Sequence, residues 1–192
     1  KVAMLARALE VFEQAGYVYV GMDHFALPDD ALAVAKRQGR LHRNFQGYST
    51  QPDCDLIGLG VSSIGRIGAT YSQNAKTLED YYDLLDQGRF PVQRGLALTR
   101  DDLARRSAIM ALMCQGELEF ESLEIAYLMN FKRYFAAELE RLAEMERQGL
   151  VEVLADRIKV TPMGWYFVRG VAMVFDSYLQ GDRQRQRFSK II

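Results

Sequence analysis

The residues best suited to contact a ligand lie between Met22 and Tyr48. Asp23 and His24 directly follow residues 17–20, an aromatic and β-branched run that predicts a short buried strand. Loops at the carboxyl ends of strands carry the sites of α/β folds, so this position favours His24 as a ligand-binding residue. The alternative is that Asp23 and His24 cap the following turn and satisfy each other.

A second candidate segment, residues 41–50, combines polar, cationic and aromatic side chains. Arg43 can bind a carboxylate through two parallel hydrogen bonds, and Phe45 can lie against a flat ring or cofactor. These properties predict an adaptable ligand-binding loop between strands. The alternative is an ordered surface loop whose aromatic side chains pack back on the core.

The remaining motifs exclude several kinds of site. The glycines between Gly58 and Gly68 follow neither the dinucleotide-binding nor the P-loop spacing. Both histidines precede Arg43, so a catalytic triad or a complete metal site is hard to build. Cys54 and Cys114 form neither a disulfide framework nor a metal-binding pair, so the sequence predicts two reduced thiols and no metal site.

Composition narrows the class of protein. The chain has 192 residues, a formal net charge of -1 and 49% hydrophobic residues, and its pI is about 6.2. This balance argues against nucleic acid as a partner, because such binding needs many contacts from Lys and Arg to phosphates. No apolar run approaches the roughly 18 residues that span a bilayer, which predicts a cytoplasmic protein without a membrane partner. Because Lys1 is not methionine and helical spacing begins at once, we expect a fragment of a longer protein.

The first half of the chain reads as the closing part of an α/β domain, residues 1–98. Helices are predicted over residues 2–15, 31–37 and 77–85, since apolar spacing, acidic first turns and terminal glycines mark their ends. Strands are predicted over residues 17–20 and 55–61, the second covered on both faces because it is almost continuously apolar.

The second half, residues 99–192, is predicted to be a mostly α, winged-helix-like domain. Helices are expected over residues 99–113, 122–129, 131–148 and 162–178, a strand over 117–120, and a hairpin over 150–160. That element order suggests a DNA-reading module as one hypothesis. However, the predicted recognition helix, residues 132–148, carries four cations against four glutamates, whereas phosphate recognition needs a positive excess. A packing or lid role therefore fits better, and the basic residues Arg183, Arg185, Arg187 and Lys190 are expected to form a solvated tail.

Five motifs of this chain resemble the oxygen-independent coproporphyrinogen III oxidases of the radical S-adenosylmethionine class. They are GMDHFALPDD (21–30), GRLHRNFQGYST (39–50), GLGVSSI (58–64), GLALTRDD (95–102) and FDSYL (175–179). The resemblance implies the C-terminal part of such an enzyme: the end of a partial α/β barrel followed by a C-terminal helical domain.

The resemblance also implies a function. The family oxidatively decarboxylates two propionates of coproporphyrinogen III to vinyl groups, which gives protoporphyrinogen IX in haem biosynthesis. Its cofactors are S-adenosylmethionine and a [4Fe-4S] cluster held by an N-terminal cysteine motif that this chain lacks. The fragment is therefore expected to bind no cofactor and to be inactive alone, whereas the full-length enzyme is expected to be a monomer.

Site residues follow from the matching motifs. By position, Phe45, Gln46 and Ile64 resemble family residues of the S-adenosylmethionine and active-site region, where Ile64 would form an apolar wall that shields a radical. We expect Arg43 and His24 to bind substrate carboxylates. No residue of this fragment is assigned as catalytic.

Two other functions stay open. A sister group in the same class acts as a haem chaperone, but it carries Tyr-Trp in the loop where this chain has Phe45 to Tyr48. A stand-alone winged-helix interaction or DNA-binding module is the other alternative. A CxxxCxxC segment upstream in the full gene product would support the enzyme.

Overall fold

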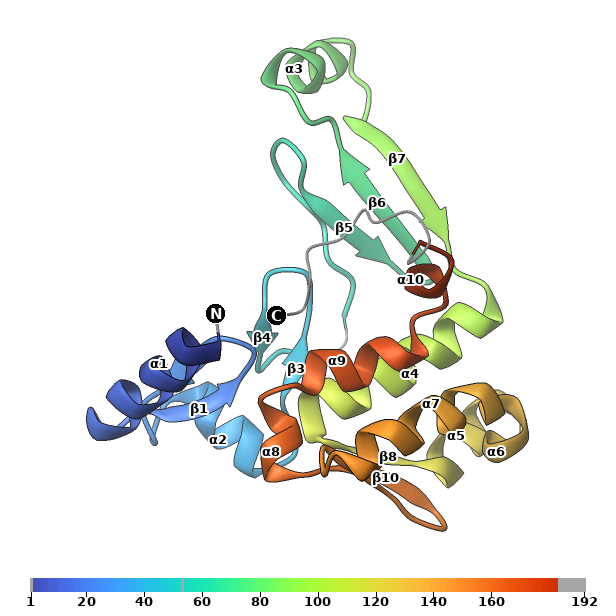
Figure 1. Ribbon diagram of the computed structural model, residues 1–192. Helices are drawn as coiled ribbons and strands as arrows, with labels where there is room; N and C mark the ends of the chain where they lie inside the picture. The colour runs from blue at the N-terminus through green and yellow to red at the C-terminus, as the bar shows by residue number, and fades with distance from the viewer. Residues whose placement is uncertain (1, 53, 183–192) are drawn as a thin grey trace. The chain divides into compact units, whose positions relative to one another are not determined.

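The computed structural model describes residues 2–52 and 54–182, and its elements are small and mixed (Figure 1). In chain order they are α1 (Val2–Gln14), β1 (Val18–Gly21), β2 (His24–Ala26), α2 (Ala31–Arg37), β3 (His42–Arg43), β4 (Tyr48–Ser49), β5 (Ile64–Ile67), β6 (Thr70–Asn74), α3 (Leu78–Asp86), β7 (Val92–Ala97), α4 (Arg100–Gln115), β8 (Glu117–Glu119), α5 (Phe120–Tyr127), α6 (Phe131–Tyr134), α7 (Ala136–Arg147), β9 (Val151–Val153), β10 (Arg157–Val160), α8 (Pro162–Trp165), α9 (Val168–Ala172), a 3₁₀ turn (Met173–Phe175) and α10 (Ser177–Asp182). The coarse expectation of a chain that combines helices and sheets is confirmed, whereas the partial barrel and the winged-helix-like domain stay predictions.

Contacts divide the chain into two compact units. Residues 1–52 and 104–192 supply the first unit, and residues 53–103 supply the second. The predicted domain boundary between residues 98 and 99 stays a prediction. Residues 183–192, which include the predicted basic tail, lie outside the described residues.

The larger core of the first unit is built from phenyl rings. Phe131, Phe135 and Phe175 are fully buried, and Phe120 stacks on Phe131 with ring centroids 4.2 Å apart. Around these rings lie one face of α4 and a three-stranded antiparallel sheet in the order β8-β10-β9. Burial of several aromatic side chains supplies most of the hydrophobic stabilisation of such a core.

This core explains two differences from the predicted helices. Residues 131–148 form two helices rather than one, because the backbone leaves helical geometry at Phe135, where the ring packs against Phe131 and Phe175. The predicted last helix, residues 162–178, begins as expected with Pro162 after the cap Thr161. It then divides into α8, α9, the 3₁₀ turn and α10.

A smaller core in the same unit joins three elements near the N-terminus to α4. Val20 of β1, Ala33 and Ala35 of α2, Leu41 and Tyr48 pack together with Cys114 near the end of α4. The β1–β2 and β3–β4 hairpins each form a two-stranded antiparallel sheet.

The second unit contains a three-stranded antiparallel sheet, β5-β6-β7, and helix α3. Helix α3 has the predicted Thr77 cap, whose hydroxyl accepts from the Asp80 N–H at 3.2 Å. The predicted strand over residues 55–61 is wrong, because Leu56 makes only an isolated bridge to Arg66. Ile57 and Leu59 are 72% and 83% exposed, so the apolar run is not a covered strand.

All strand pairs of the described residues are antiparallel. The α/β domain predicted for residues 1–98 therefore shows no parallel strand pairing within its described residues. None of the described helices is both long and apolar enough to cross a membrane.

A buried ion cluster ties α4 to α7. Glu138 is 5% exposed, and one of its carboxylate oxygens accepts from Arg105 at 3.0 Å and from Arg141 at 2.8 Å. Arg105 also donates to the Phe175 carbonyl at 3.2 Å, which connects the cluster to the 3₁₀ turn.

Replacing Glu138 by alanine should lower the free energy of unfolding by about 3 kcal/mol, because it removes the buried carboxylate that Arg105 and Arg141 share. Urea denaturation followed by circular dichroism measures the change. The control is Glu144→Ala, which removes an exposed carboxylate paired with Arg147 and should change stability by less than about 0.5 kcal/mol. Equal effects of the two variants would show that the buried cluster does not stabilise the fold.

Candidate functional site

The β3–β4 hairpin presents Phe45 and Gln46 at its tip. Arg43 and Tyr48 are paired across the two strands, and the Asn44 N–H donates to the Gly47 carbonyl at 3.0 Å. Within the turn, the Asn44 side chain accepts from the Gln46 N–H at 2.8 Å. Phe45 is 51% exposed and Gln46 is also exposed, so both side chains are accessible to a ligand.

The β1–β2 hairpin presents His24 beside a tight two-residue turn. Met22 and Asp23 both have positive φ, 43° and 68°, as two-residue hairpin turns require. The His24 Nδ1 lies 2.9 Å from the Met22 carbonyl, and because a carbonyl only accepts, Nδ1 carries the proton. His24 thus stabilises its own turn, while its Nε2 faces Gly47 of the other hairpin.

Tyr48 brings the two hairpins together. The His24 ring meets the Tyr48 ring edge-on with centroids 5.1 Å apart, and the Arg43 guanidinium carbon lies 5.0 Å from the centroid of the same ring. The Tyr48 hydroxyl donates to the Met113 carbonyl of α4 at 2.8 Å. Burial raises the pKa of Tyr48 far above its ordinary value, so the ring remains a neutral phenol. We name His24, Arg43, Gly47 and Tyr48 the Tyr48 cluster.

Arg43 is the residue of the Tyr48 cluster that indicates ligand binding. Its Nη1 is buried and has no hydrogen-bond partner among residues 2–52 and 54–182. A buried donor without an acceptor costs about 1 to 3 kcal/mol, so native proteins rarely leave one unsatisfied. A carboxylate is the acceptor that a guanidinium fits best. The geometry therefore makes Arg43 a candidate anion-binding residue, with His24 packed on the same ring.

Ile64 lies in the other unit. It begins β5, where it pairs with Gln73 of β6, and its side chain is half-buried. The structure thus brings together His24 and Arg43, and places Phe45 and Gln46 on the same hairpin as Arg43. The role of Ile64 beside them stays a prediction.

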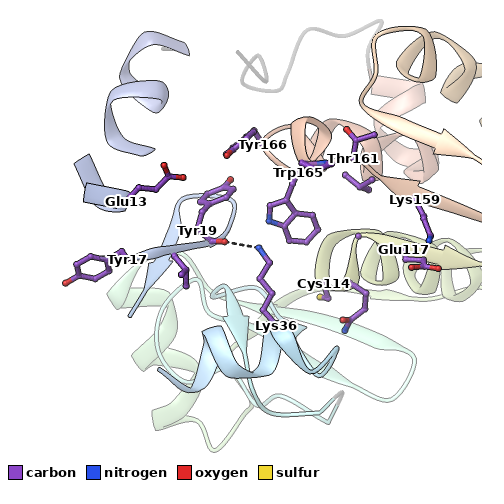
Figure 2. Close-up of a pocket in the computed structure, with 15 residues that line it drawn as sticks. Glu13, Tyr17, Tyr19, Lys36, Cys114, Glu117, Lys159, Thr161, Trp165 and Tyr166 are labelled. Atoms are coloured by element: carbon purple, nitrogen blue, oxygen red, sulfur yellow. Dashed lines mark hydrogen bonds between the residues drawn. The ribbon is translucent and has the colours of Figure 1, made fainter. Parts of the chain in front are cut away.

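The sequence did not identify Lys36 as a candidate site residue. Lys36 lines a cavity of about 670 Å³ in the first unit together with Trp165, the single tryptophan of the chain (Figure 2). Lys36 is on the short helix α2 and Trp165 is on α8, far away in sequence. No pattern of neighbouring residues predicts that Lys36 and Trp165 meet. The single tryptophan is the one sequence feature that could have pointed to this cavity.

The thiols and acidic groups show no metal-binding arrangement. Within residues 2–52 and 54–182, no three His, Cys, Asp or Glu side chains lie close enough to hold a metal ion. Cys54 is exposed, whereas Cys114 is buried, and burial raises the pKa of Cys114 to about 12. Cys114 is therefore a neutral, unreactive thiol at neutral pH.

Gly47 is required by the contact with His24. Its φ is +143°, and a Cβ atom there would lie 2.6 Å from the His24 Nε2. The Gly47→Ala variant should lose about 2 kcal/mol more stability than Gly16→Ala, since Gly16 also has positive φ (+82°) but nothing within 4 Å. Urea unfolding measures both variants.

A double-mutant cycle tests the cause of that loss. If the His24 ring is the obstacle, then His24→Ala and Gly47→Ala should couple favourably by about 1 kcal/mol. Strictly additive effects would show that backbone strain alone explains the need for glycine.

Comparisons with known proteins agree with the motifs. Residues 98–167 match the family model described as HemN C-terminal domain. The chain is 48% identical to an oxygen-independent coproporphyrinogen III oxidase of Synechocystis sp., over 98% of this chain and 41% of that protein. It is 46% identical to the protein of the same name from Escherichia coli (strain K12), over 100% of this chain and 42% of that protein.

A solved structure gives the same result. It is described as "Coproporphyrinogen III oxidase (HemN) from Escherichia coli is a Radical SAM enzyme" and superposes with a TM-score of 0.89 at 47% identity, covering 93% of this chain and 41% of that chain. The chain thus spans about two-fifths of the length of these relatives. The resemblance indicated by the sequence motifs is confirmed: this chain is similar over its length to part of the radical S-adenosylmethionine coproporphyrinogen III oxidases and matches their HemN C-terminal domain.

Proposed function

We propose that this chain is the C-terminal part of an oxygen-independent coproporphyrinogen III oxidase. In the proposed reaction, two propionates of coproporphyrinogen III lose carbon dioxide and become vinyl groups, which gives protoporphyrinogen IX. The observation that carries the proposal is identity of 46–48% with proteins of that name over 98% or more of the chain. The residues of the Tyr48 cluster supply chemistry that fits such a substrate.

The iron-sulfur cluster does not fit the described residues of this chain. Three or more thiolates must meet to hold a [4Fe-4S] cluster, and the chain has only Cys54, which is exposed, and Cys114, which is buried and neutral. In the proposed enzyme, the cluster ligands therefore belong to sequence outside this chain. The cluster and S-adenosylmethionine would supply the radical, and this chain would contribute binding surfaces.

The proposed role of the β3–β4 tip is to contact S-adenosylmethionine. The accessible ring of Phe45 offers a flat apolar face, and the amide of Gln46 can both donate and accept hydrogen bonds. From the resemblance, Ile64 is proposed to form an apolar wall that excludes water from a radical. Its half-buried position in β5 supports an apolar contact rather than a polar one.

The proposed role of Arg43 is to bind a propionate carboxylate of the substrate. Its buried, unpartnered Nη1 and its fixed position over Tyr48 support this assignment, since the donor is held in place before the ligand arrives. His24, packed edge-on against the same Tyr48 ring, would adjoin the same carboxylate.

The finer architecture is part of the proposal. The order of α4, β8, α5, α6, α7 and the β9–β10 hairpin supports a winged-helix-like domain over residues 99–192. Residues 1–98 are proposed to complete a partial α/β barrel together with sequence outside this chain. The monomeric state of the enzyme and its cytoplasmic location also stay predictions.

The alternative functions receive less support. In the helix that would read DNA, Arg141 pairs with Glu138 and Arg147 pairs with Glu144, so two of its four cations are neutralised within the helix. The relatives reported above are named oxidases rather than chaperones.

Arg43→Met in a full-length enzyme should raise KM for coproporphyrinogen III more than it lowers kcat. A hydrogen bond to a charged group contributes about 1.5 to 3 kcal/mol, which corresponds to a loss of roughly 10- to 100-fold in kcat/KM. Arg43→Lys should recover part of the loss because it keeps the charge. An unchanged KM in Arg43→Met would remove Arg43 from the substrate site.

Gln46→Ala and Ile64→Asp should lower turnover without loss of cluster. The first variant removes a positioned amide, and the second places a poorly solvated carboxylate against the cofactor. Turnover and the iron content of the full-length enzyme are measured together, with Glu144→Ala as the exposed control. Wild-type turnover in both site variants would contradict the assignment of these residues by resemblance.

A further inference from the structure

The cavity of the first unit has the size of a small-molecule site. Its volume of about 670 Å³ lies within the range of roughly 300 to 1,000 Å³ of such sites. Its walls come from the end of α1, from β1, α2, the turn between α4 and β8, the end of β10, and α8. Figure 2 shows the Lys36 side chain rising from α2 between Tyr19 and Trp165. The residues of the Tyr48 cluster do not line it.

Lys36 is the central polar group of this cavity. Its Nζ donates to the Tyr19 carbonyl at 2.8 Å and lies 4.5 Å from the centroid of the Trp165 ring. No carboxylate forms an ion pair with it among residues 2–52 and 54–182. An ammonium group has three donors, so at least one remains for a ligand. The charge is partly desolvated and has no anionic partner.

The flat walls beside Lys36 are held in place. The Trp165 indole N–H donates to the Val20 carbonyl at 3.1 Å, and a Cβ on Gly116 would lie 3.1 Å from the same ring. Tyr19 and Tyr166 are stacked with centroids 5.3 Å apart. All three aromatic side chains are partly exposed, so their rings face the cavity without closing it. A planar ligand would thus meet surfaces that need little rearrangement.

The charges at the rim favour an anion. Lys159 adds a second cation, and no ion pair of its own is formed among the described residues. Glu117 also lines the cavity, but Arg157 donates to it at 2.5 Å and neutralises it. Glu13, exposed on the last turn of α1, is the other carboxylate of the lining, and it forms no ion pair among residues 2–52 and 54–182.

We propose that this cavity binds a planar aromatic anion, with its carboxylate or phosphate at Lys36 and its ring against the walls of Tyr19, Trp165 and Tyr166. The shared chemistry is a conjugated ring that carries an acidic group, which a nucleotide and a tetrapyrrole both provide. The inference goes beyond the proposed oxidase function and uses none of the residues assigned to it.

Binding of an anion should be linked to proton uptake. Burial lowers the pKa of Lys36 to about 8, so part of the free protein carries a neutral amine at pH 8. A bound anion favours the charged amine and therefore raises its pKa, and a proton is taken up as the ligand binds. At pH 6.5, Lys36 is already charged and the uptake should vanish.

The other titratable groups around Lys36 do not account for this proton uptake. Burial raises the pKa of Cys114 to about 12, and burial likewise raises the pKa of Tyr19, so neither group changes charge near pH 8. The remaining titratable side chains of the lining are Glu13, Tyr17, Glu117, Lys159 and Tyr166. The comparison of Lys36→Arg with wild type removes their contribution, because an arginine stays charged at both pH values.

The test is isothermal titration calorimetry of the 192-residue chain with two probes, adenosine 5′-monophosphate and coproporphyrin III. At least one probe should bind with a Kd of about 1 mM or tighter. Lys36→Met should weaken that binding at least tenfold, and Lys36→Arg should retain it. Titrations at pH 8 in buffers of different ionisation enthalpy should show proton uptake in the wild type and none in Lys36→Arg.

Control variants distinguish specific binding in the cavity from non-specific binding elsewhere on the protein. Lys132→Met removes a lysine that also lies near an aromatic ring, 5.9 Å from the centroid of Phe120, but outside the cavity, and should bind as the wild type does. Far-ultraviolet circular dichroism checks that each variant is folded. The probe that binds identifies the source of the ligand as nucleotide or tetrapyrrole.

Three results would overturn the inference. The first is that neither probe binds the wild type at 1 mM. The second is that Lys36→Met binds as tightly as the wild type. The third is that neutral adenosine binds as tightly as adenosine 5′-monophosphate while coproporphyrin III does not bind. These results leave the proposed oxidase function untouched, because none of the residues assigned to it lines the cavity.

Discussion

The first unit depends on helix α4, which belongs to two cores at once. Ala104, Ala108 and Leu112 pack into the phenylalanine-rich core, whereas Cys114, two residues beyond Leu112, packs into the smaller core around Val20. Hydrogen bonds reinforce the second contact, since Gln115 donates to the Leu41 carbonyl at 2.9 Å. A helix buried on two sides has little freedom to shift, so its carboxyl end is a fixed reference for the elements that carry the candidate site.

Tyr48 connects the candidate site to the carboxyl end of α4. Because the phenol is anchored on the Met113 carbonyl, its ring gives His24 and Arg43 a common support although they lie on different hairpins. The short strands alone could not do this, since two-stranded sheets are only marginally stable in water. The positions of the ligand-binding candidates are thus set by packing against α4 rather than by the hairpins themselves.

Sequence patterns predicted the elements whose ends are chemically marked. Thr77 with Glu79 and Asp80 predicted α3, and Pro162 after Thr161 predicted the start of α8. Patterns failed where tertiary packing decides: the buried ring of Phe135 interrupts a helical stripe, and the apolar residues 55–61 pair only at Leu56. His24 and Arg43 could be named from their motifs, but their meeting at Tyr48 could not be predicted, because it requires two hairpins and a helix about 65 residues away.

The hydrogen bond from Trp165 to Val20 has a consequence for synthesis of the chain. It joins residues 145 positions apart, so the strand that contains Val20 leaves the ribosome long before its partner exists. At about 5 to 20 residues per second, the delay is roughly 7 to 30 s. The β1–β2 hairpin lacks the end of α4 until residue 115 is made, and it lacks Trp165 until residue 165 is made. The amino-terminal segment of this unit is therefore made first but completes its packing only after α8 has been synthesised.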